Sequence, residues 1–353
     1  MTRESPKAHS DMSARLIRTA GICVALAAAI AALGNRLRAP IHEWPVPDLV
    51  GKVFVVTGCT TGIGLETARA LASWNATVIM ANRNLQKSRD IAPAGVVEHR
   101  ELDLASFAST RAFAGSLLKE ARRIDVLILN AATTADGGET VDGIDVQYQV
   151  NHLSHFLLAN LLLPIMKPTS RIIFVSSSMH YYGEISRAAY NATAKNLEPA
   201  TRRMGMTVYS DTKLMNTMTA VELDKRLKAA GRSGVSVMSV HPGFVQSDLD
   251  QDAGPVMRFL MPKVRSFLAR DTPSGARTQL RVATGKEFDS GAGGRYFADD
   301  CINSLCDGLV PAAPASDPGQ RMWLWDTSVA LTGLDVNLDE QGVRALDSEL
   351  EDM

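Results

Sequence analysis

The chain has 353 residues, with 37 basic and 38 acidic side chains and a formal net charge of -1. A chain of this length can bury a large core, and its balanced charge argues against the basic surface typical of nucleic-acid-binding proteins. Its four cysteines are few and irregularly spaced, which argues against a disulfide framework. We interpret them as free thiols, and only a pairing of Cys301 with Cys306 in an oxidising compartment stays open.

An uncharged apolar run, Ala20–Gly34, lies near the N-terminus between arginines on both sides. The run is shorter than the ~20 residues that span a bilayer, but snorkelling arginine side chains could extend it. We expect a single-pass anchor over about residues 16–38, within an N-terminal extension of residues 1–48 that ends in a proline-rich linker. A cleaved signal peptide and an amphipathic or disordered extension are the alternatives. The anchor predicts location in the endoplasmic reticulum or another intracellular membrane, and the flanking arginines leave its orientation open.

From residue 49 to residue 335, short apolar runs alternate with longer amphipathic stretches. This alternation is typical of βαβ units and predicts one α/β domain with a doubly wound Rossmann fold. We expect a seven-stranded, mostly parallel sheet with helices on both faces, followed by an acidic, solvated tail over residues 336–353. The expected strands are Val53–Thr57, Thr77–Ala81, Val96–Leu102, Val126–Asn130, Arg171–Ser177, Val235–His241 and about Gly294–Ala298. The expected helices include Ile63–Trp74, Phe107–Arg122, Gly143–Leu163, Asp211–Ala230 and Pro273–Thr284.

A glycine-rich segment, TGCTTGIG, follows the first expected strand and opens the first expected helix. Glycines at this place allow a tight turn and let a dinucleotide pyrophosphate approach the N–H groups at a helix N-terminus. The segment therefore predicts nucleotide binding, and an ordinary glycine-rich turn is the alternative. The residues assigned to this loop are Thr57, Gly58, Thr61, Gly62, Ile63 and Gly64.

The second expected strand ends without the acidic residue that would bind the adenosine ribose of NAD. Asn82 and Arg83 stand there instead, and a guanidinium is a planar donor for a 2′-phosphate. NADP(H) is therefore favoured, although NAD(H) stays possible if Arg83 only caps a surface turn. After the third strand, Asp103 and Leu104 are placed to meet the adenine edge, with a helix N-cap near Asp103 as the alternative.

Tyr209 and Lys213 are four residues apart, which places them on one face of a helix start. A free phenol has a pKa of about 10, and a nearby cation stabilises the phenolate and lowers that pKa. Tyr209 could then exchange a proton with an alcohol or a carbonyl while a hydride passes to or from a nicotinamide. Ser177 follows the fifth strand, where its hydroxyl could hold the substrate oxygen, although the three serines there could also cap the strand.

Together these motifs resemble those of short-chain dehydrogenases/reductases. Over about residues 50–334 the chain is similar to the retinol-dehydrogenase-like branch of that family. The ordered matches are TGCTTGIG, ANRN, Asp103-Leu104, LNAA, Val150-Asn151-His152, VSSS, YSDTK, HPGFVQSDL, Arg295-Tyr296-Phe297, Trp325-Asp326-Thr327-Ser328 and Thr332-Gly333-Leu334. The last three correspond to the closing strand and helix of the branch.

The resemblance assigns a role to each residue of the expected site. It makes Ser177 the contact of the substrate oxygen, Tyr209 the general acid/base, and Lys213 the residue that lowers the phenol pKa and holds the nicotinamide ribose. Asn151 would hold a water that links Lys213 to solvent; taken alone, it reads as a buried polar group of a helix. The resemblance also implies that further residues line the cofactor: Asn130, Ala131, Pro242, Gly243, Val245 and Ser247.

Three departures from the family pattern lie near the expected cofactor site. Leu129 and Ala132 replace the more usual Asn and Gly after the fourth strand, and Ser154 stands where glycine is common. None of them belongs to the proton-transfer set, so we expect activity to survive. Whether their added bulk weakens cofactor binding stays open.

The sequence thus predicts an NADP(H)-dependent oxidoreductase that interconverts an alcohol and a carbonyl on a small lipophilic substrate, such as a retinoid, a polyprenol or a steroid. A catalytically idle nucleotide-binding or regulatory scaffold is the alternative, and a homodimer is possible. We expect no metal, because His152 and His155 lack a third ligand nearby. An apolar segment over residues 257–268 is either a substrate lid or core, and Trp323 and Trp325 are expected on the apolar face of the last helix.

Overall fold

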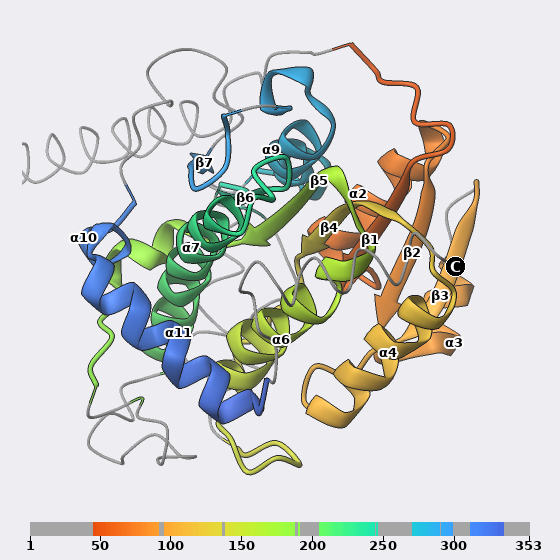
Figure 1. Ribbon diagram of the computed structural model, residues 1–353. Coiled ribbons are helices and arrows are strands. Elements are labelled where there is room, and N and C mark those ends of the chain that lie inside the picture. Colours follow the sequence, from red (N-terminus) through yellow and green to blue (C-terminus); the bar gives the residue numbers. More distant parts are fainter. Residues whose placement is uncertain are drawn as a thin grey trace, which may run out of the picture.

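The computed structural model describes residues 45–91, 95–135, 138–187, 190, 205–243, 245, 270–289, 291–298 and 311–334. Within them a seven-stranded sheet has the order β3-β2-β1-β4-β5-β6-β7, and every strand pair is parallel (Figure 1). The predicted fold class is confirmed. The strands are β1 Val53–Thr57, β2 Thr77–Asn82, β3 Val97–Glu101, β4 Ile124–Leu129, β5 Met166–Val175, β6 Ser236–His241 and β7 Tyr296–Ala298.

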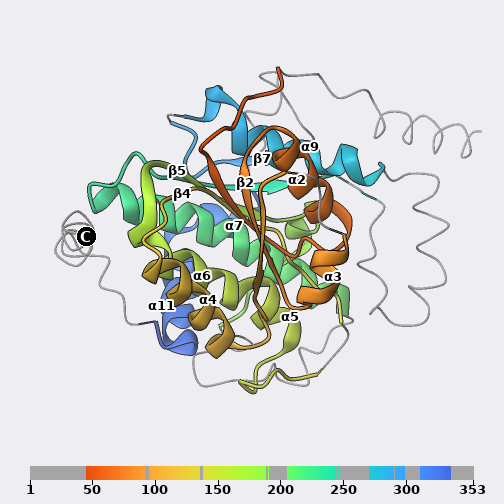
Figure 2. The same ribbon diagram turned by 90° about the vertical axis from the view of Figure 1, so that its right-hand side faces the viewer.

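Helices cover both faces of the sheet, because its central strands are apolar on both sides. Figure 2 shows α2 and α9 on one side and α4, α6, α7 and α11 on the other. Each helix layer packs against one face of the sheet and forms a separate hydrophobic core. Leu71 of α2 lies in the first core, and Leu117 of α4 and Leu223 of α7 lie in the second. The helices are α2 Gly62–Ser73, α3 Leu85–Asp90, α4 Phe107–Lys119, α5 Val146–Tyr148, α6 Ser154–Leu161, α7 Gly205–Ala229, α9 Thr272–Thr284, α10 Ala313–Ser316 and α11 Pro318–Thr332.

The strand order reverses direction between β1 and β4. From β1 the chain builds the sheet outward through β2 and β3, and it then returns to place β4 on the other side of β1. In open parallel sheets, ligands bind outside the carboxyl ends of the strands at such a switch point. The loops after β1 and β4 are therefore where the fold itself places a binding site.

The helix expected over residues 143–163 is not one regular helix. A π-helical turn, Gln149–Leu153 (η1), separates α5 from α6. Such turns often lie at functional sites, and this one contains Asn151. The apolar residues of the segment 143–163 keep helical spacing throughout, so the sequence pattern did not indicate the π-helical turn.

Several element boundaries also differ from the prediction. Helix α7 begins at Gly205 rather than Asp211, so Tyr209 lies within it, and the short helix α3 was not expected. Strand β5 begins at Met166, five residues earlier than expected, because Met166 already pairs with Ile124. Pro168 lies within the register shift that follows this pair. An irregularity of this kind tolerates a residue with no N–H to donate.

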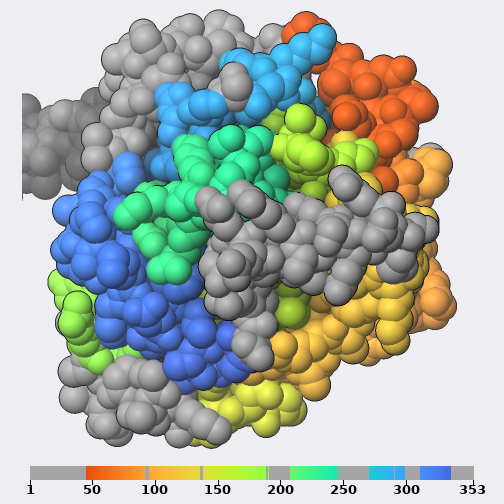
Figure 3. All heavy atoms as spheres, in the orientation of Figure 1, coloured from red at the N-terminus to blue at the C-terminus, as the bar shows by residue number. Residues whose placement is uncertain are grey.

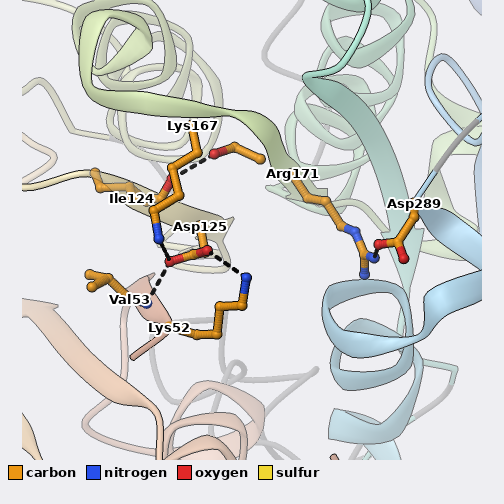
Figure 4. Close-up of polar contacts among 8 residues, drawn as sticks. Lys52, Val53, Ile124, Asp125, Lys167, Arg171 and Asp289 are labelled. Atoms are coloured by element: carbon orange, nitrogen blue, oxygen red, sulfur yellow. Dashed lines mark hydrogen bonds and ion pairs between the residues drawn. The ribbon is translucent and has the colours of Figure 1, made fainter. Parts of the chain in front are cut away.

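The amino edge of the sheet holds a cluster of paired charges (Figure 4). The Asp125 carboxylate accepts hydrogen bonds from Lys167 Nζ at 2.7 Å and from the Val53 N–H at 2.9 Å, and Lys52 Nζ lies 3.2 Å away. Burial alone would raise the pKa of Asp125, but hydrogen bonds from Lys167, Val53 and Lys52 hold it below its ordinary value. Arg171 is paired in a similar way with Asp289.

Several predictions concern segments outside the described residues: the anchor over residues 16–38, the apolar segment 257–268, Ser247, Cys301, Cys306 and the tail. Within the part of the chain that the structure describes, no helix is both long and apolar enough to cross a bilayer.

Candidate active site

The glycine loop packs tightly against the end of β4. Gly58 has a φ of +70°, and a Cβ added to it would lie 2.8 Å from the Cα and Cβ of Ala131. A Cβ on Gly64 would lie 2.3 Å from the Gly58 carbonyl oxygen. The loop therefore requires glycine for its conformation at Gly58 and for the approach of strand, loop and helix at Gly64.

The N-terminus of α2 is open to a ligand. Its N-cap residue, Thr61, makes no side-chain capping hydrogen bond, and the first turn carries no acidic residue. The first N–H groups of a helix lack intrahelical partners and attract anions. The loop and helix could therefore hold the pyrophosphate of a dinucleotide. The assignment of Thr57, Gly58, Thr61, Gly62, Ile63 and Gly64 to that contact stays a prediction.

The Thr57 hydroxyl joins three elements of the site. Its oxygen accepts the N–H groups of Asn130 at 2.9 Å and Ala131 at 3.0 Å, so β1 and β4 are fixed to each other. The Asn130 side chain returns a bond to the Thr57 carbonyl at 3.0 Å. Because the Thr57 oxygen is already an acceptor twice, its hydrogen faces the Nε2 of His155, 3.0 Å away.

The side chain of Asn82, at the end of β2, forms its hydrogen bonds within the protein. Its Oδ1 accepts the N–H of Cys59 in the glycine loop at 2.6 Å, and its Nδ2 donates to Ser88 at 2.9 Å. Arg83 is exposed beside it, and no carboxylate of the described residues pairs with its guanidinium. Asn84, not Arg83, caps the following helix α3. The arginine side chain is thus available to a ligand.

Asp103 and Leu104 follow β3 on the same edge of the sheet. Asp103 is half-buried and its carboxylate accepts the Ala105 N–H at 2.9 Å, while Leu104 is buried in the core. The helix N-cap near Asp103 is Ser106, which caps α4, so Asp103 does not itself cap this helix.

Lys213 and Tyr209 lie one turn apart on α7 and face the end of β5. The Lys213 amine is 5.4 Å from the centre of the Tyr209 ring and donates a hydrogen bond of 2.8 Å to the Val175 carbonyl oxygen. Both side chains are buried, and burial lowers the pKa of Lys213 to about 7. No carboxylate of the described residues forms an ion pair with this amine, and its charge also acts on His155, whose pKa is lowered mainly by burial and in part by Lys213.

The three serines after β5 have different environments. Ser176 is buried and bonded to α7, because its Oγ donates to the Lys213 carbonyl oxygen at 2.8 Å and accepts from Thr217 at 3.0 Å. Ser178 is exposed. Ser177, between them, accepts the Met179 N–H at 3.2 Å and finds no acceptor for its hydroxyl hydrogen among the described residues. Its hydroxyl can therefore donate a hydrogen bond to a ligand.

Asn151 is fully enclosed in the π-helical turn. Its Oδ1 accepts the Thr133 N–H at 2.8 Å, and its Nδ2 donates to the Thr133 carbonyl oxygen and to the Thr212 hydroxyl. Its own carbonyl oxygen accepts from Asn216 at 3.0 Å and lies 3.2 Å from His155 Nδ1. The side chain thus joins the loop after β4 to α7, and its role in a water relay stays a prediction.

The loop after β6 completes the edge. Pro242 and Gly243 are half-buried, and the Gly243 N–H donates to His241 Nδ1 at 2.9 Å. Val245 is buried and bridges to Arg270, while Ser247 lies outside the described residues.

The departures from the family pattern are accommodated by the structure. Leu129 is fully buried in the core, and Ser154 donates a hydrogen bond to the Leu104 carbonyl oxygen at 2.6 Å. Ala132 is half-buried beyond the end of β4.

Sequence reasoning gave no structural role in the site to three residues that shape it. His155 bonds to Thr57, Gly183 lies against α7, and Asp211 fastens the segment after β5. The Asp211 carboxylate accepts the Glu184 N–H and the Tyr190 hydroxyl, each at 2.7 Å. These partners are distant in sequence, so no local motif could have indicated them. His152 and His155 belong to no group of metal-ligand type among the described residues.

Comparison with known proteins agrees with this architecture. Residues 52–211 match the family model described as short chain dehydrogenase. The chain is 36% identical over 300 residues to human retinol dehydrogenase 11, covering 82% of this chain and 88% of the relative. Human retinol dehydrogenase 13 is 34% identical over 302 residues, covering 81% and 86%. The WW domain-containing oxidoreductase of Gallus gallus is 34% identical, covering 80% and 69%.

Solved structures show the same fold. An uncharacterized protein from Mycobacterium paratuberculosis has a TM-score of 0.65 and 32% identity, covering 83% of this chain and 98% of that one. A Beutenbergia cavernae protein described as an NAD(P)-dependent gluconate 5-dehydrogenase, solved with NADP, has a TM-score of 0.53 and 22% identity, covering 73% and 98%. From its sequence relatives and its fold, the chain belongs to the short-chain dehydrogenase/reductase family of oxidoreductases, in the retinol-dehydrogenase-like branch.

Proposed function

We propose that the protein is an NADP(H)-dependent oxidoreductase that interconverts an alcohol and a carbonyl on a small lipophilic substrate. The observation that carries this proposal is the buried Lys213 amine beside the Tyr209 ring, where both face the end of the strand that bears Ser177. An amine kept in such a place destabilises the fold, so its retention there favours a chemical role.

The nicotinamide, when bound, supplies or accepts the hydride. In the oxidative direction Tyr209 takes the hydroxyl proton of the alcohol while the hydride leaves the carbon that bears the hydroxyl. In the reductive direction Tyr209 gives a proton to the carbonyl oxygen while the hydride is added to the carbonyl carbon. The Ser177 hydroxyl holds the reacting oxygen by donating a hydrogen bond. A positive charge on Lys213 stabilises the phenolate form of Tyr209.

The proposed preference for NADP(H) is supported by the residues at the end of β2. Asn82 uses its amide for Cys59 and Ser88, and the exposed Arg83 offers a planar cation to the 2′-phosphate. An adenosine ribose without that phosphate would meet no acidic acceptor at this strand end.

The lipophilic substrate class is supported by two features. Several relatives are retinol dehydrogenases, and the N-terminal run Ala20–Gly34 would hold the enzyme at a membrane, where apolar alcohols such as retinoids, polyprenols or steroids concentrate. Extraction of cell membranes with carbonate tests the anchor: full-length protein should stay in the pellet, and a chain lacking residues 1–48 should be released.

The function is tested by supplying purified full-length protein with NADP+ or NAD+ and a panel of retinol, a polyprenol, a hydroxysteroid and short water-soluble alcohols. We expect NADPH to form with at least one of the three apolar alcohols, and more slowly with NAD+ and with the short alcohols. A panel without turnover in either direction would favour the idle scaffold instead.

A further inference from the structure

The turn that carries Ser177 is held by an imidazole that the proposed mechanism does not use. His180 lies in the 3-10 turn Ser178–Tyr182 (η3) and is fully buried. Its Nδ1 is 2.7 Å from the Ser177 carbonyl oxygen, which also accepts the His180 N–H at 3.0 Å. A carbonyl oxygen only accepts, so Nδ1 must carry a hydrogen.

The other nitrogen of the ring has a different partner. The N–H of Ala312, just before α10, donates to His180 Nε2 at 3.3 Å. Nε2 must therefore be without hydrogen, and the two contacts together define a neutral ring of one tautomer. Burial lowers the pKa of His180 to about 4, which agrees with that neutral form.

The ring is also enclosed by aromatic neighbours. Its centre is 4.0 Å from the centre of the Tyr181 ring and 4.7 Å from that of Tyr296 in β7. The imidazole thus joins three parts of the fold: the turn after β5, the last strand, and the segment that leads into α10 and α11. Figure 3 shows residues 311–334, in the darkest blue, on the surface beside α7 in green.

From this arrangement we propose that His180 is a positioning residue, which holds the Ser177 turn in its reactive geometry and is itself oriented by the backbone of Ala312. The proposal rests on the proposed function, because Ser177 is assigned there to the substrate oxygen. It adds that the segment preceding α10 orients the imidazole through the Ala312 N–H, without touching the substrate.

Three substitutions of His180 distinguish the contributions of Nδ1, of Nε2 and of the packing of the ring. His180→Asn places an amide near Nδ1 and keeps a donor for the Ser177 carbonyl oxygen, whereas His180→Gln reaches the Nε2 position and loses that donor. His180→Phe keeps the ring packing against Tyr181 and Tyr296 and loses both bonds. Ala312→Pro removes only the N–H that faces Nε2, at a residue whose φ of -48° suits proline.

We expect kcat to fall about tenfold in His180→Phe and His180→Gln, and by no more than about threefold in His180→Asn and Ala312→Pro, as loss or retention of the bond to Ser177 implies. The Kd for NADPH should stay unchanged in all four, because the glycine loop is not involved. Tyr182→Phe changes an exposed residue of the same turn; it is the matched control, and its kcat and Kd should equal those of the wild type. A wild-type kcat in His180→Phe, an Asn variant as poor as the Phe variant, or a parallel loss of NADPH affinity would overturn the proposal.

Amide hydrogen exchange separates this proposal from the proposed function, since it needs no turnover. Exchange at Ala312 should accelerate in His180→Phe and His180→Asn, and exchange at the amides of residues 179 and 180 should accelerate in His180→Phe and His180→Gln, the two variants that lose the bond to Ser177. If wild-type protein is inactive but this pattern appears, the function fails and the positioning contact stands. Unchanged exchange at Ala312 would overturn the contact whatever the activity.

Discussion

At the amino edge of the sheet the buried charges are paired, whereas at the carboxyl edge a buried amine faces a phenol and a carbonyl oxygen. Asp125 is surrounded by two lysines and an N–H group, as Figure 4 shows, and Lys213 has no carboxylate among the described residues. Burial lowers the pKa of Lys213 to about 7, while the partners of Asp125 hold its pKa below the ordinary value despite burial. The paired charges at the first edge stabilise the fold, whereas the buried amine at the second edge destabilises it, a cost that the proposed acid–base role of Tyr209 and Lys213 would explain.

The largest effect expected from this contrast is that of Lys213→Met. Removing the amine should lower kcat by about 10²–10⁴-fold, the usual contribution of acid–base assistance. The same change should raise the melting temperature of the cofactor-free protein, because it removes a poorly compensated buried charge. Steady-state kinetics and thermal unfolding of Lys213→Met would check the fall in kcat and the rise in melting temperature.

The pH dependence sharpens this test. Unfolded Lys213 keeps its proton up to its ordinary pKa of about 10.4, and the folded state releases it above about pH 7. The cost of burial is therefore complete below pH 7 and declines as the pH rises towards 10. The gain in melting temperature of Lys213→Met should be larger at pH 6 than at pH 9, and a gain that grows with pH would contradict the assignment.

The next largest effect should come from the amino edge. Asp125→Asn leaves Lys52 and Lys167 without their carboxylate, and we expect a loss of about 2–4 kcal/mol in the free energy of unfolding, with kcat per folded molecule unchanged. Urea unfolding measures the loss. Glu101→Gln, at an exposed acid with no partner in the described structure, is the control and should stay within about 0.5 kcal/mol of wild type.

Acid titration gives this prediction a definite sign. A carboxylate with a lowered folded pKa stabilises the protein above its unfolded pKa of about 3.9 and loses that contribution as the pH falls below it. The stability difference between wild type and Asp125→Asn should therefore narrow below about pH 4. A constant difference down to pH 2 would show that the ion pairs are not its source.

A smaller effect tests the cofactor assignment. Arg83→Ser should raise the KM for NADPH by about 10–100-fold, as loss of a charge-assisted contact predicts, and leave the KM for NADH unchanged. Lys87→Ser, an exposed cation of α3 nearby, should change neither. Equal effects of Arg83→Ser on both cofactors would remove the argument for a 2′-phosphate contact.

The smallest effect concerns Gly183, where the Ser177 turn meets α7. A Cβ there would lie 2.8 Å from the Ser210 carbonyl oxygen and 2.9 Å from the Leu214 Cβ. Gly183→Ala should cost about 1–3 kcal/mol of stability through overpacking and lower kcat a few-fold, since the turn and the Tyr209 helix must separate. The control is Gly115→Ala, in helix α4 with open space around the added Cβ, which should stabilise the protein slightly. Gly231→Ala would not serve as a control, because the φ of +76° at Gly231 disfavours alanine.

The sequence predicted the sheet and the cofactor loop because their signals are local. The run of strand, glycines and helix from Val53 to Ser73 follows from chain periodicity and from the needs of the backbone at Gly58 and Gly64. The resemblance supplied the roles of Tyr209, Lys213 and Ser177, and the structure brings these side chains to one edge of the sheet.

What could not be predicted depends on contacts between distant segments. Thr57 and His155 are 98 positions apart, and His180 and Ala312 are 132 apart, so no window of sequence contains either pair. The π-helical turn at Asn151 was missed because apolar spacing does not record which carbonyl a given N–H meets. The hydrogen bonds of the Asn82 side chain to Cys59 and Ser88 could not be predicted either, because the sequence pattern does not record the partners of a polar side chain.

The most direct measurement of the account is a single-turnover reaction of Tyr209→Phe with bound NADPH and a carbonyl substrate that the wild type reduces. Phenylalanine keeps the buried ring beside Lys213 and removes the only group assigned to deliver the proton. We predict NADPH binding with wild-type affinity and hydride transfer slower by about 10³-fold or more. Hydride transfer at the wild-type rate would contradict the assignment of Tyr209 as the proton donor.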